Sequence, residues 1–248
     1  SGNLFTDGWA GPNQERSLSK ARLLSRAYMR MEVAAINVGD LDLLHGPTFL
    51  RKEASHGLPL VSSNLVNPAT KAHIVKPYII KKVGTIRVAF FGLLSPDIKT
   101  DIYKEAGKKF QIKEPVKTAR EMTTMLRGKA DIIILLSALS SDRQQEIINA
   151  APGIHFVLGG HDSRYVQSPL WERQTPILES YKYGMYTGKL KITFANASSP
   201  YSYEMMEEQT TQQASSGDEL KNSRQPASRT NSFRWTLIPL DMSLLEDK

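Results

Sequence analysis

The sequence predicts a layered α/β domain, and three observations lead to that fold class. Short apolar runs rich in β-branched and aromatic residues recur along the 248 residues, and such runs are typical of buried strands. Stretches with helical spacing of apolar residues lie between several of these runs. Apolar residues make up 40% of the chain, which is enough to bury a substantial core in one large domain.

The first part of the chain predicts a helix followed by two buried strands. We interpret Ser1-Gly2-Asn3-Leu4-Phe5 as the end of a strand whose start is absent. A helical pattern then runs from Leu18 to Met31. The apolar runs Val33–Asn37 and Leu58–Ser62 follow as strands. Further on, Val83-Gly84 is flanked by two strand patterns and predicts a hairpin of residues 78–82 and 85–90.

The middle of the chain alternates helices with strands. Pro115–Leu126 predicts a helix closed by Gly128, because proline suits the first turn and glycine follows the last. Asp142–Ala150 predicts a second helix, with Ser140 or Ser141 as its cap. Two strands are expected around this helix, at residues 131–136 and 154–158. This alternation is the pattern from which we predict the layered architecture.

The last part predicts three more strands and a polar interruption. Residues 175–180 and 188–194 are expected to complete a second sheet. The segment from Glu204 to Ser232 is polar and without apolar periodicity, so we expect a linker. Phe233–Leu240 is expected as a short strand in which Pro239 permits only an edge or terminal position. The predicted division is a main domain at 1–198, an excursion at 199–232 and a terminal strand segment at 233–248.

Composition excludes several classes of function. The chain has no cysteine, so a metal would need His, Asp, Glu or Asn ligands. The formal charge of +7 is spread along the sequence, whereas nucleic-acid binding requires a concentrated basic surface, and the densest cluster, Lys104–Lys113, is interpreted as a solvated face. No window approaches the roughly 18 apolar residues of a membrane span. We therefore expect neither a nucleic-acid partner nor membrane insertion.

Two short segments carry the functional signal, and each follows an apolar run. They are Gly39-Asp40-Leu41-Asp42-Leu43-Leu44-His45-Gly46 and Gly159-Gly160-His161-Asp162-Ser163. The pair resembles two metal-site loops of the calcineurin-like metallophosphoesterases, in particular the catalytic domain of the 5'-nucleotidase branch. That family carries Gly-Asn-His-Glu-Phe-Asp-Phe-Gly and Gly-Gly-His-Thr-His at these places. The resemblance extends over residues 1–194 and implies a four-layer αββα sandwich with a two-cation site for metals such as Mn or Zn.

The resemblance leaves three candidate metal ligands. Asp40 replaces the metal-binding Asn of the family, and His161 is retained. Asn3 stands where the family has the Asp that bridges the two cations, but a neutral amide is a weak bridge. On this basis Asp40, His161 and Asn3 are expected to hold at most one weakly bound cation.

Other ligands of the family are replaced. Leu41 stands where the resemblance implies a His that acts as general acid, and a hydrocarbon cannot move a proton. Ala138 replaces a lone His ligand and Ser163 replaces the last ligand. The family's first Asp-x-His strand has no counterpart. The expected site is therefore degenerate, because a two-metal clamp needs a dense set of ligands.

Structural roles also explain the surviving residues. Asp42, which replaces a Glu of the family, is expected to cap the helix that follows. His161 is explained equally well as a loop histidine bonded to backbone. Trp9, Trp171 and Trp235 are interpreted as packing anchors rather than a ligand cage.

Three functions remain open at this stage. The preferred one is a binding or sensing module that holds a nucleotide, another anion or a partner surface without hydrolysis. By resemblance it would be periplasmic or extracellular and joined to further modules of a larger exported protein. The main alternative is a working metal-dependent phosphoesterase acting on nucleotides or other phosphate monoesters. The third is a scaffold whose cleft is filled by side chains such as Leu41 and Leu43.

Overall fold

The computed structural model describes residues 3–5, 14–97, 109–162, 164–181, 184–196, 199–204 and 230–240. The helices are α1 (Gln14–Arg30), the 3-10 helix η1 (Leu41–His45), α2 (Gly46–Ser55), α3 (Pro115–Leu126) and α4 (Ser141–Ala150). The strands are β1 (Ile36–Asn37), β2 (Leu60–Val61), β3 (Leu65–Val66), β4 (Tyr78–Val83), β5 (Ile86–Leu94), β6 (Gln111–Ile112), β7 (Ile132–Ala138), β8 (Phe156–Leu158), β9 (Leu170–Glu172), β10 (Thr175–Leu178), β11 (Tyr186–Thr193), β12 (Tyr201–Tyr203) and β13 (Asn231–Pro239).

The largest sheet has the strand order β4-β5-β7-β8-β10-β9. Its inner strands β5, β7, β8 and β10 are parallel, and the outer strands β4 and β9 are antiparallel to their neighbours. Strand β7 is buried over its full length, as expected for a parallel strand covered on both faces. Its side chains alternate between two cores: Ile133 and Leu135 belong to one, while Ile132, Ile134 and Leu136 belong to the other.

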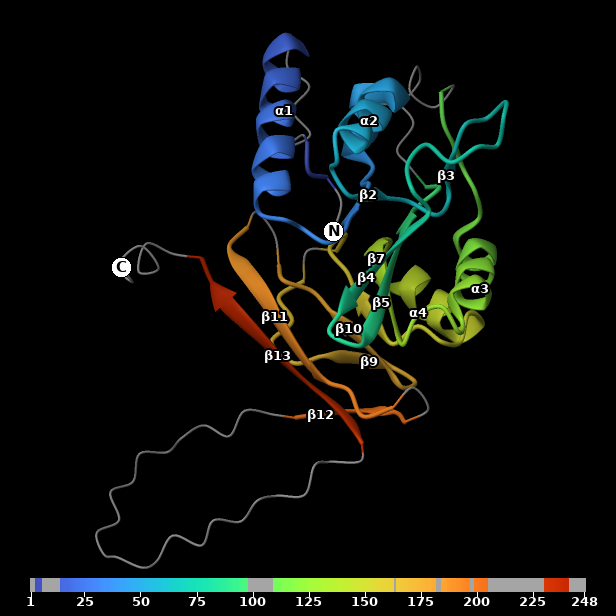
Figure 1. Cartoon of the computed structure of the whole chain (residues 1–248), viewed down its shortest axis with the longest axis vertical. Helices are drawn as coiled ribbons and strands as arrows, with labels where there is room; N and C mark the ends of the chain where they lie inside the picture. The colour runs from blue at the N-terminus through green and yellow to red at the C-terminus, as the bar shows by residue number, and fades with distance from the viewer. Residues whose placement is uncertain are drawn as a thin grey trace, which may run out of the picture.

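Different elements cover the two faces of this sheet. Helices α3 and α4 pack on one face through Met122, Leu126 and Ile147. The strands β11 and β13 pack on the opposite face, where Phe233 and Trp235 join the core. Figure 1 shows α3 and α4 to one side of the β4–β5 hairpin and the long β11–β13 ribbon to the other.

A further helical layer lies over β1 and β2. Ala21 of α1 and Leu50 of α2 share a core with Ile36 and Leu60 of these two strands. Helices α1 and α2 stand together at one end of the molecule in Figure 1. The order of layers is therefore helix, sheet, sheet, helix, and the mixed α/β fold expected from the sequence is confirmed.

Local signals explain why α3 forms where the sequence predicts it. The side chain of Glu114 accepts hydrogen bonds from the backbone N–H of Val116 at 2.9 Å and of Lys117 at 2.6 Å, which satisfies two free donors of the first turn. Pro115 occupies the first turn, where its missing N–H costs nothing. Gly128 adopts a φ of +77° just beyond the helix, a conformation that favours glycine.

Several predicted strands are confirmed in altered form. The hairpin of β4 and β5 is antiparallel, with Val83 opposite Ile86 and Gly84 at a φ of +59°. The expected strands at 33–37 and 58–62 shorten to β1 and β2. The prediction that residues 175–180 join a second sheet was wrong. This segment forms β10, which pairs in parallel with β8 in the large sheet. Of the two segments expected in the second sheet, only residues 188–194 lie there, as part of β11.

The end of the described chain forms a three-stranded sheet in the order β11-β13-β12. Strand β12 lies inside the range 199–232 that we expected to be a polar excursion, and residues 205–229 lie outside the described part. Pro239 is the last residue of β13, consistent with the terminal position that the sequence predicted. Within the described residues, no helix is long and apolar enough to cross a membrane.

Candidate functional site

The first predicted site loop follows β1, and the carboxylate of Asp42 holds it in place. Asp42 is fully buried. It accepts hydrogen bonds from the backbone N–H of Gly39 at 2.8 Å, of Asn3 at 3.0 Å and of Phe5 at 2.9 Å. Burial raises the pKa of Asp42 to about 6, although these three bonds act to lower it. Asp42 therefore joins residues 3–5 to the loop. The expectation that Asp42 caps the following helix was wrong, because its carboxylate is taken up by these three backbone groups.

The other predicted residues of this loop have different environments. Asn3, at a φ of +60°, accepts a hydrogen bond on Oδ1 from the backbone N–H of Leu41 at 2.9 Å. The Asn3 amide oxygen, which the resemblance places between the two cations, is thus already bonded to the backbone N–H of Leu41. Asp40 is half-buried, precedes η1 and makes no capping hydrogen bond with its side chain. Leu41 is half-buried.

The second predicted loop follows β8 and is more open. His161 is exposed. Asp162 accepts hydrogen bonds from the backbone N–H of Ser141, at 2.8 Å, and from the Ser141 hydroxyl. Burial acts to raise the pKa of Asp162, but the bonds from Ser141 hold it below its usual value. The loop is thereby fixed to the start of α4. Ser163 lies outside the described residues.

An ion pair between a buried carboxylate and a partly exposed arginine supports this second loop, and the sequence did not reveal it. Glu179 is 1% exposed and accepts from Arg164 Nη2 at 2.9 Å and from the Arg164 backbone N–H at 3.2 Å. Gly159 is needed beside it, because a Cβ there would lie 2.8 Å from Glu179 Oε1. The available signal was a lone carboxylate directly after the buried run of β10.

The residues do not form a two-cation centre in the described chain. Ala138, at the end of β7, is buried in the apolar core that α1 and α2 share with β1. Asn3 and Gly159 line one cavity, whereas neither Asp40 nor His161 is part of its lining. Among the described residues, no group of three or more His, Asp or Glu side chains could hold a metal ion. The donor set present there does not fit the two-metal site that the resemblance implies.

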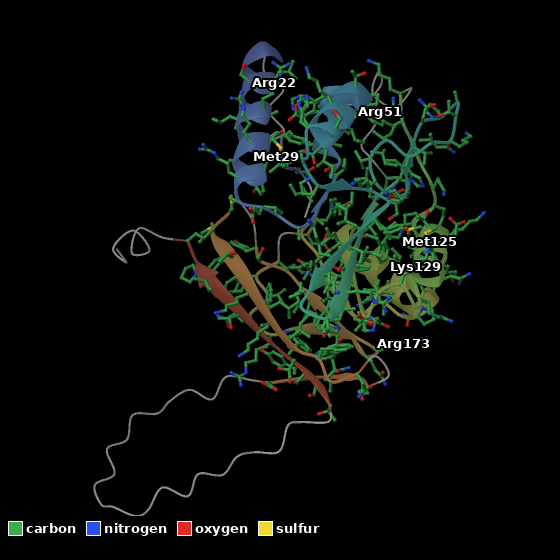
Figure 2. The ribbon with its side chains drawn as sticks, in the orientation of Figure 1. Arg22, Met29, Arg51, Met125, Lys129 and Arg173 are labelled. Atoms are coloured by element: carbon green, nitrogen blue, oxygen red, sulfur yellow. The ribbon has the colours of Figure 1, made fainter. Side chains whose placement is uncertain are left out.

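The basic residues labelled in Figure 2 lie on separate elements of the fold. Figure 2 labels four basic residues, Arg22, Arg51, Lys129 and Arg173. Arg22 lies on α1, Arg51 on α2, Lys129 after α3, and Arg173 between β9 and β10. The labelled charges thus come from four separate parts of the fold.

Sequence comparison finds relatives named as a metallophosphoesterase, an apyrase and a cyclic-nucleotide phosphodiesterase/3'-nucleotidase. The metallophosphoesterase YunD of Bacillus subtilis, described as uncharacterized, is 27% identical over 54% of this chain and 29% of its own length. An apyrase of Aedes aegypti is 24% identical over 66% of this chain and 34% of its own. A 2',3'-cyclic-nucleotide 2'-phosphodiesterase/3'-nucleotidase of Salmonella typhimurium is 23% identical over 55% of this chain and 24% of its own length. The chain thus spans about a third or less of these relatives. No family model matches it.

Solved structures share the fold. The sulfate thiohydrolase SoxB of Thermus thermophilus aligns with a TM-score of 0.67 and 18% identity, over 77% of this chain and 34% of that one. A 5'-nucleotidase precursor, also of Thermus thermophilus, aligns with a TM-score of 0.60 and 21% identity, over 75% and 39%. The calcineurin-like phosphoesterase YfkN of Bacillus subtilis aligns with a TM-score of 0.60 and 18% identity, over 71% and 63%.

Proposed function

From the premise that the homologues and structural neighbours of this chain are metallophosphoesterases of the 5'-nucleotidase type, we propose that the domain binds a nucleotide or a similar phosphate-bearing ligand without hydrolysing it. The fold and the two loops are kept, but the groups that would perform the reaction are replaced. The domain is then a binding or sensing module.

The observation that carries the proposal is the use of the first loop's polar groups as structural ties. Asp42 accepts three backbone N–H groups, and Asn3 accepts a fourth. Leu41 offers no proton at the place where the resemblance implies a general acid. A hydrolytic site needs an activated water, a charge-stabilising centre and a proton donor. In the first loop, Asp42 and Asn3 are engaged by backbone N–H groups and Leu41 cannot donate a proton, which argues against such a site.

The ligand class follows from the relatives. The apyrase, the 3'-nucleotidase and the snake venom 5'-nucleotidase of Crotalus adamanteus are named for reactions of nucleotides. The exposed His161 and the Ser141–Asp162 pair leave the second loop accessible for such a ligand. A divalent cation such as Mn or Zn would be held at most weakly, through Asp40 and His161, and would serve binding rather than turnover.

The test combines binding with turnover. AMP is titrated into the purified protein by calorimetry, with and without Mn or Zn, after elemental analysis of bound metal. Release of phosphate from AMP and from an aryl phosphate is followed in the same samples. We expect AMP binding that weakens about tenfold in His161→Ala, and no release above background. His56→Ala, an exposed histidine in the turn after α2, is the matched control.

Each other outcome decides against the proposal. Phosphate release that depends on added metal would show a working phosphoesterase. Absence of AMP binding would favour a scaffold whose cleft is filled by Leu41 and Leu43. Equal loss of binding in His161→Ala and His56→Ala would place the ligand elsewhere.

The proposal also includes an exported location for the protein. Two of the relatives are venom proteins, which supports a periplasmic or extracellular location. Cell fractionation of the native host, with detection by antibody, tests this part. Recovery in the cytoplasmic fraction would contradict it.

A further inference from the structure

Three tyrosine rings meet where three separate segments of the chain come together. Tyr165 lies between β8 and β9, Tyr181 lies after β10, and Tyr186 begins β11. The ring centroid of Tyr165 is 4.9 Å from that of Tyr186 and 5.9 Å from that of Tyr181. The centroids of Tyr181 and Tyr186 are 6.2 Å apart. We call these three residues the tyrosine cluster.

The rings of the tyrosine cluster are not stacked on one another. The interplanar angle is 81° between Tyr165 and Tyr181, and 52° between Tyr165 and Tyr186. Edge-on and tilted pairs of this kind leave the ring faces without a parallel aromatic neighbour. Tyr165 is also 45% exposed. Its ring therefore offers a surface on which a further planar group can stack.

The backbone that carries Tyr165 is held on three sides. Arg164, which precedes it, forms the ion pair of the second loop at 2.9 Å. Tyr165 itself forms an antiparallel backbone bridge with Ser180. Val166, which follows, is buried, and its carbonyl accepts from Trp235 Nε1 at 2.9 Å. An exposed ring on a backbone held in this way is presented in one position, which lowers the entropy cost of binding to it.

The hydroxyl of Tyr165 is bonded within the protein. Gln167 Nε2 donates a hydrogen bond to the Tyr165 hydroxyl oxygen at 2.9 Å. The pKa of Tyr186 is raised, mainly because its hydroxyl is hydrogen-bonded to that of Tyr165. With its hydroxyl engaged in this way, Tyr165 offers a ligand the face of its ring rather than a polar group.

The tyrosine cluster is also close to the second loop along the chain. Tyr165 follows His161 by four residues, which limits the distance between their Cα atoms to about 14 Å. Both residues are exposed. A ligand of the size of a mononucleotide can therefore contact both side chains.

We propose that the tyrosine cluster is the base-binding part of the nucleotide site, with the base stacked on the ring of Tyr165 and the phosphate at the second loop. This inference rests on the proposed function, and it names the part of the ligand that the chain recognises beyond the phosphate. An aromatic face accepts any nucleobase through its π surface. The cluster should therefore favour nucleotides over sugar phosphates and discriminate weakly among the bases.

The test compares two ligands that share the sugar and the phosphate and differ in the base. AMP and ribose 5-phosphate are titrated separately into the purified protein by calorimetry. We expect AMP to bind about tenfold more tightly, a preference of the size that one base–aromatic stack supplies. Equal affinities for the two ligands would overturn the base site and leave the proposed function intact. Binding of neither ligand would overturn both.

Two substitutions of Tyr165 separate stacking from a structural role. Tyr165→Leu removes the aromatic face and should abolish the preference for AMP, while ribose 5-phosphate binds as before. Tyr165→Phe keeps the ring without its hydroxyl and should retain the preference. Weaker binding of both ligands to Tyr165→Leu by the same factor would overturn the stacking role. Loss of the preference in Tyr165→Phe would overturn it as well.

Trp171→Leu is the matched control, because Trp171 is an aromatic residue of similar exposure, 42%, on β9 and outside the tyrosine cluster. It should leave the affinities for AMP and for ribose 5-phosphate unchanged. A loss of the preference as large as that in Tyr165→Leu would overturn the assigned position. Thermal denaturation of each variant verifies that it is folded at the temperature of the titration. In NMR spectra of the wild type, the adenine ring protons of bound AMP should shift upfield, and an absence of this shift would also overturn the stacking.

Discussion

The two loops predicted to form the site differ in how their polar side chains are used. In the first loop, Asp42 is buried and bound to backbone N–H groups of its own loop and of residues 3–5. In the second loop, His161 is exposed. Asp162 accepts a hydrogen bond from Ser141 at the start of α4, and Arg164 forms an ion pair with Glu179. The first loop thus uses its carboxylate for structure, whereas the second keeps an exposed imidazole.

This difference shows that two loops at the ends of neighbouring strands can be held by different kinds of contact. Asp42 fixes the first loop so that Leu41 and Asp40 keep their places beside β1. The second loop is held by one ion pair and by hydrogen bonds that leave its histidine accessible. Removing the Asp42 hydrogen bonds should therefore lower the free energy of unfolding more than removing the Arg164–Glu179 ion pair does.

Removing the Asp42 carboxylate should have the largest effect. Asp42→Ala leaves three backbone N–H groups without their acceptor, and the free energy of unfolding at pH 5 should fall by about 4 kcal/mol. Urea denaturation measures this value. Asp40→Ala is the matched control and should change it by about 0.5 kcal/mol or less, because no capping hydrogen bond involves the Asp40 side chain. Equal effects would contradict the structural role of Asp42.

The stability of the first loop should also depend on pH. The pKa of Asp42 is raised from 3.8 to about 6 in the folded protein, so between these values the folded state holds a proton that the unfolded state has lost. Raising the pH from 4 to 7 should therefore narrow the stability difference between the wild type and Asp42→Ala by about 2 kcal/mol. Urea denaturation across this range tests the sign. A difference that widens with pH would show that the three N–H bonds outweigh burial.

Breaking the ion pair of the second loop should have a smaller effect. Arg164→Met leaves the buried Glu179 carboxylate without its guanidinium partner, and the free energy of unfolding should fall by about 2 kcal/mol. Arg143→Met removes a partner from the exposed Glu146 and should cost about 0.5 kcal/mol or less. Urea denaturation of both variants makes the comparison. A loss for Arg164→Met larger than that for Asp42→Ala would reverse the ranking of the loops.

The sequence predicted elements best where the signal was local. The bounds of α3 match the prediction because Glu114, Pro115 and Gly128 act within one turn of its ends. A helix after the first loop was expected, but the bounds of α2 were not predicted, although Pro47 in its first turn was an available signal. The predicted positions of Asp40 and His161 at strand ends are confirmed. Their roles as metal ligands remain a prediction.

The sequence by itself determined the α/β class, the buried strands and the two loops, because apolar periodicity and turn residues act over a few neighbours. The tertiary structure alone decided that β10 joins the large sheet and that Asp42 lies beneath residues 3–5. It also decided that the three rings of the tyrosine cluster meet. These features depend on contacts between segments far apart in the chain, such as Asn3 with Asp42. Such long-range contacts depend on how whole layers pack, so a pattern of neighbouring residues does not predict them.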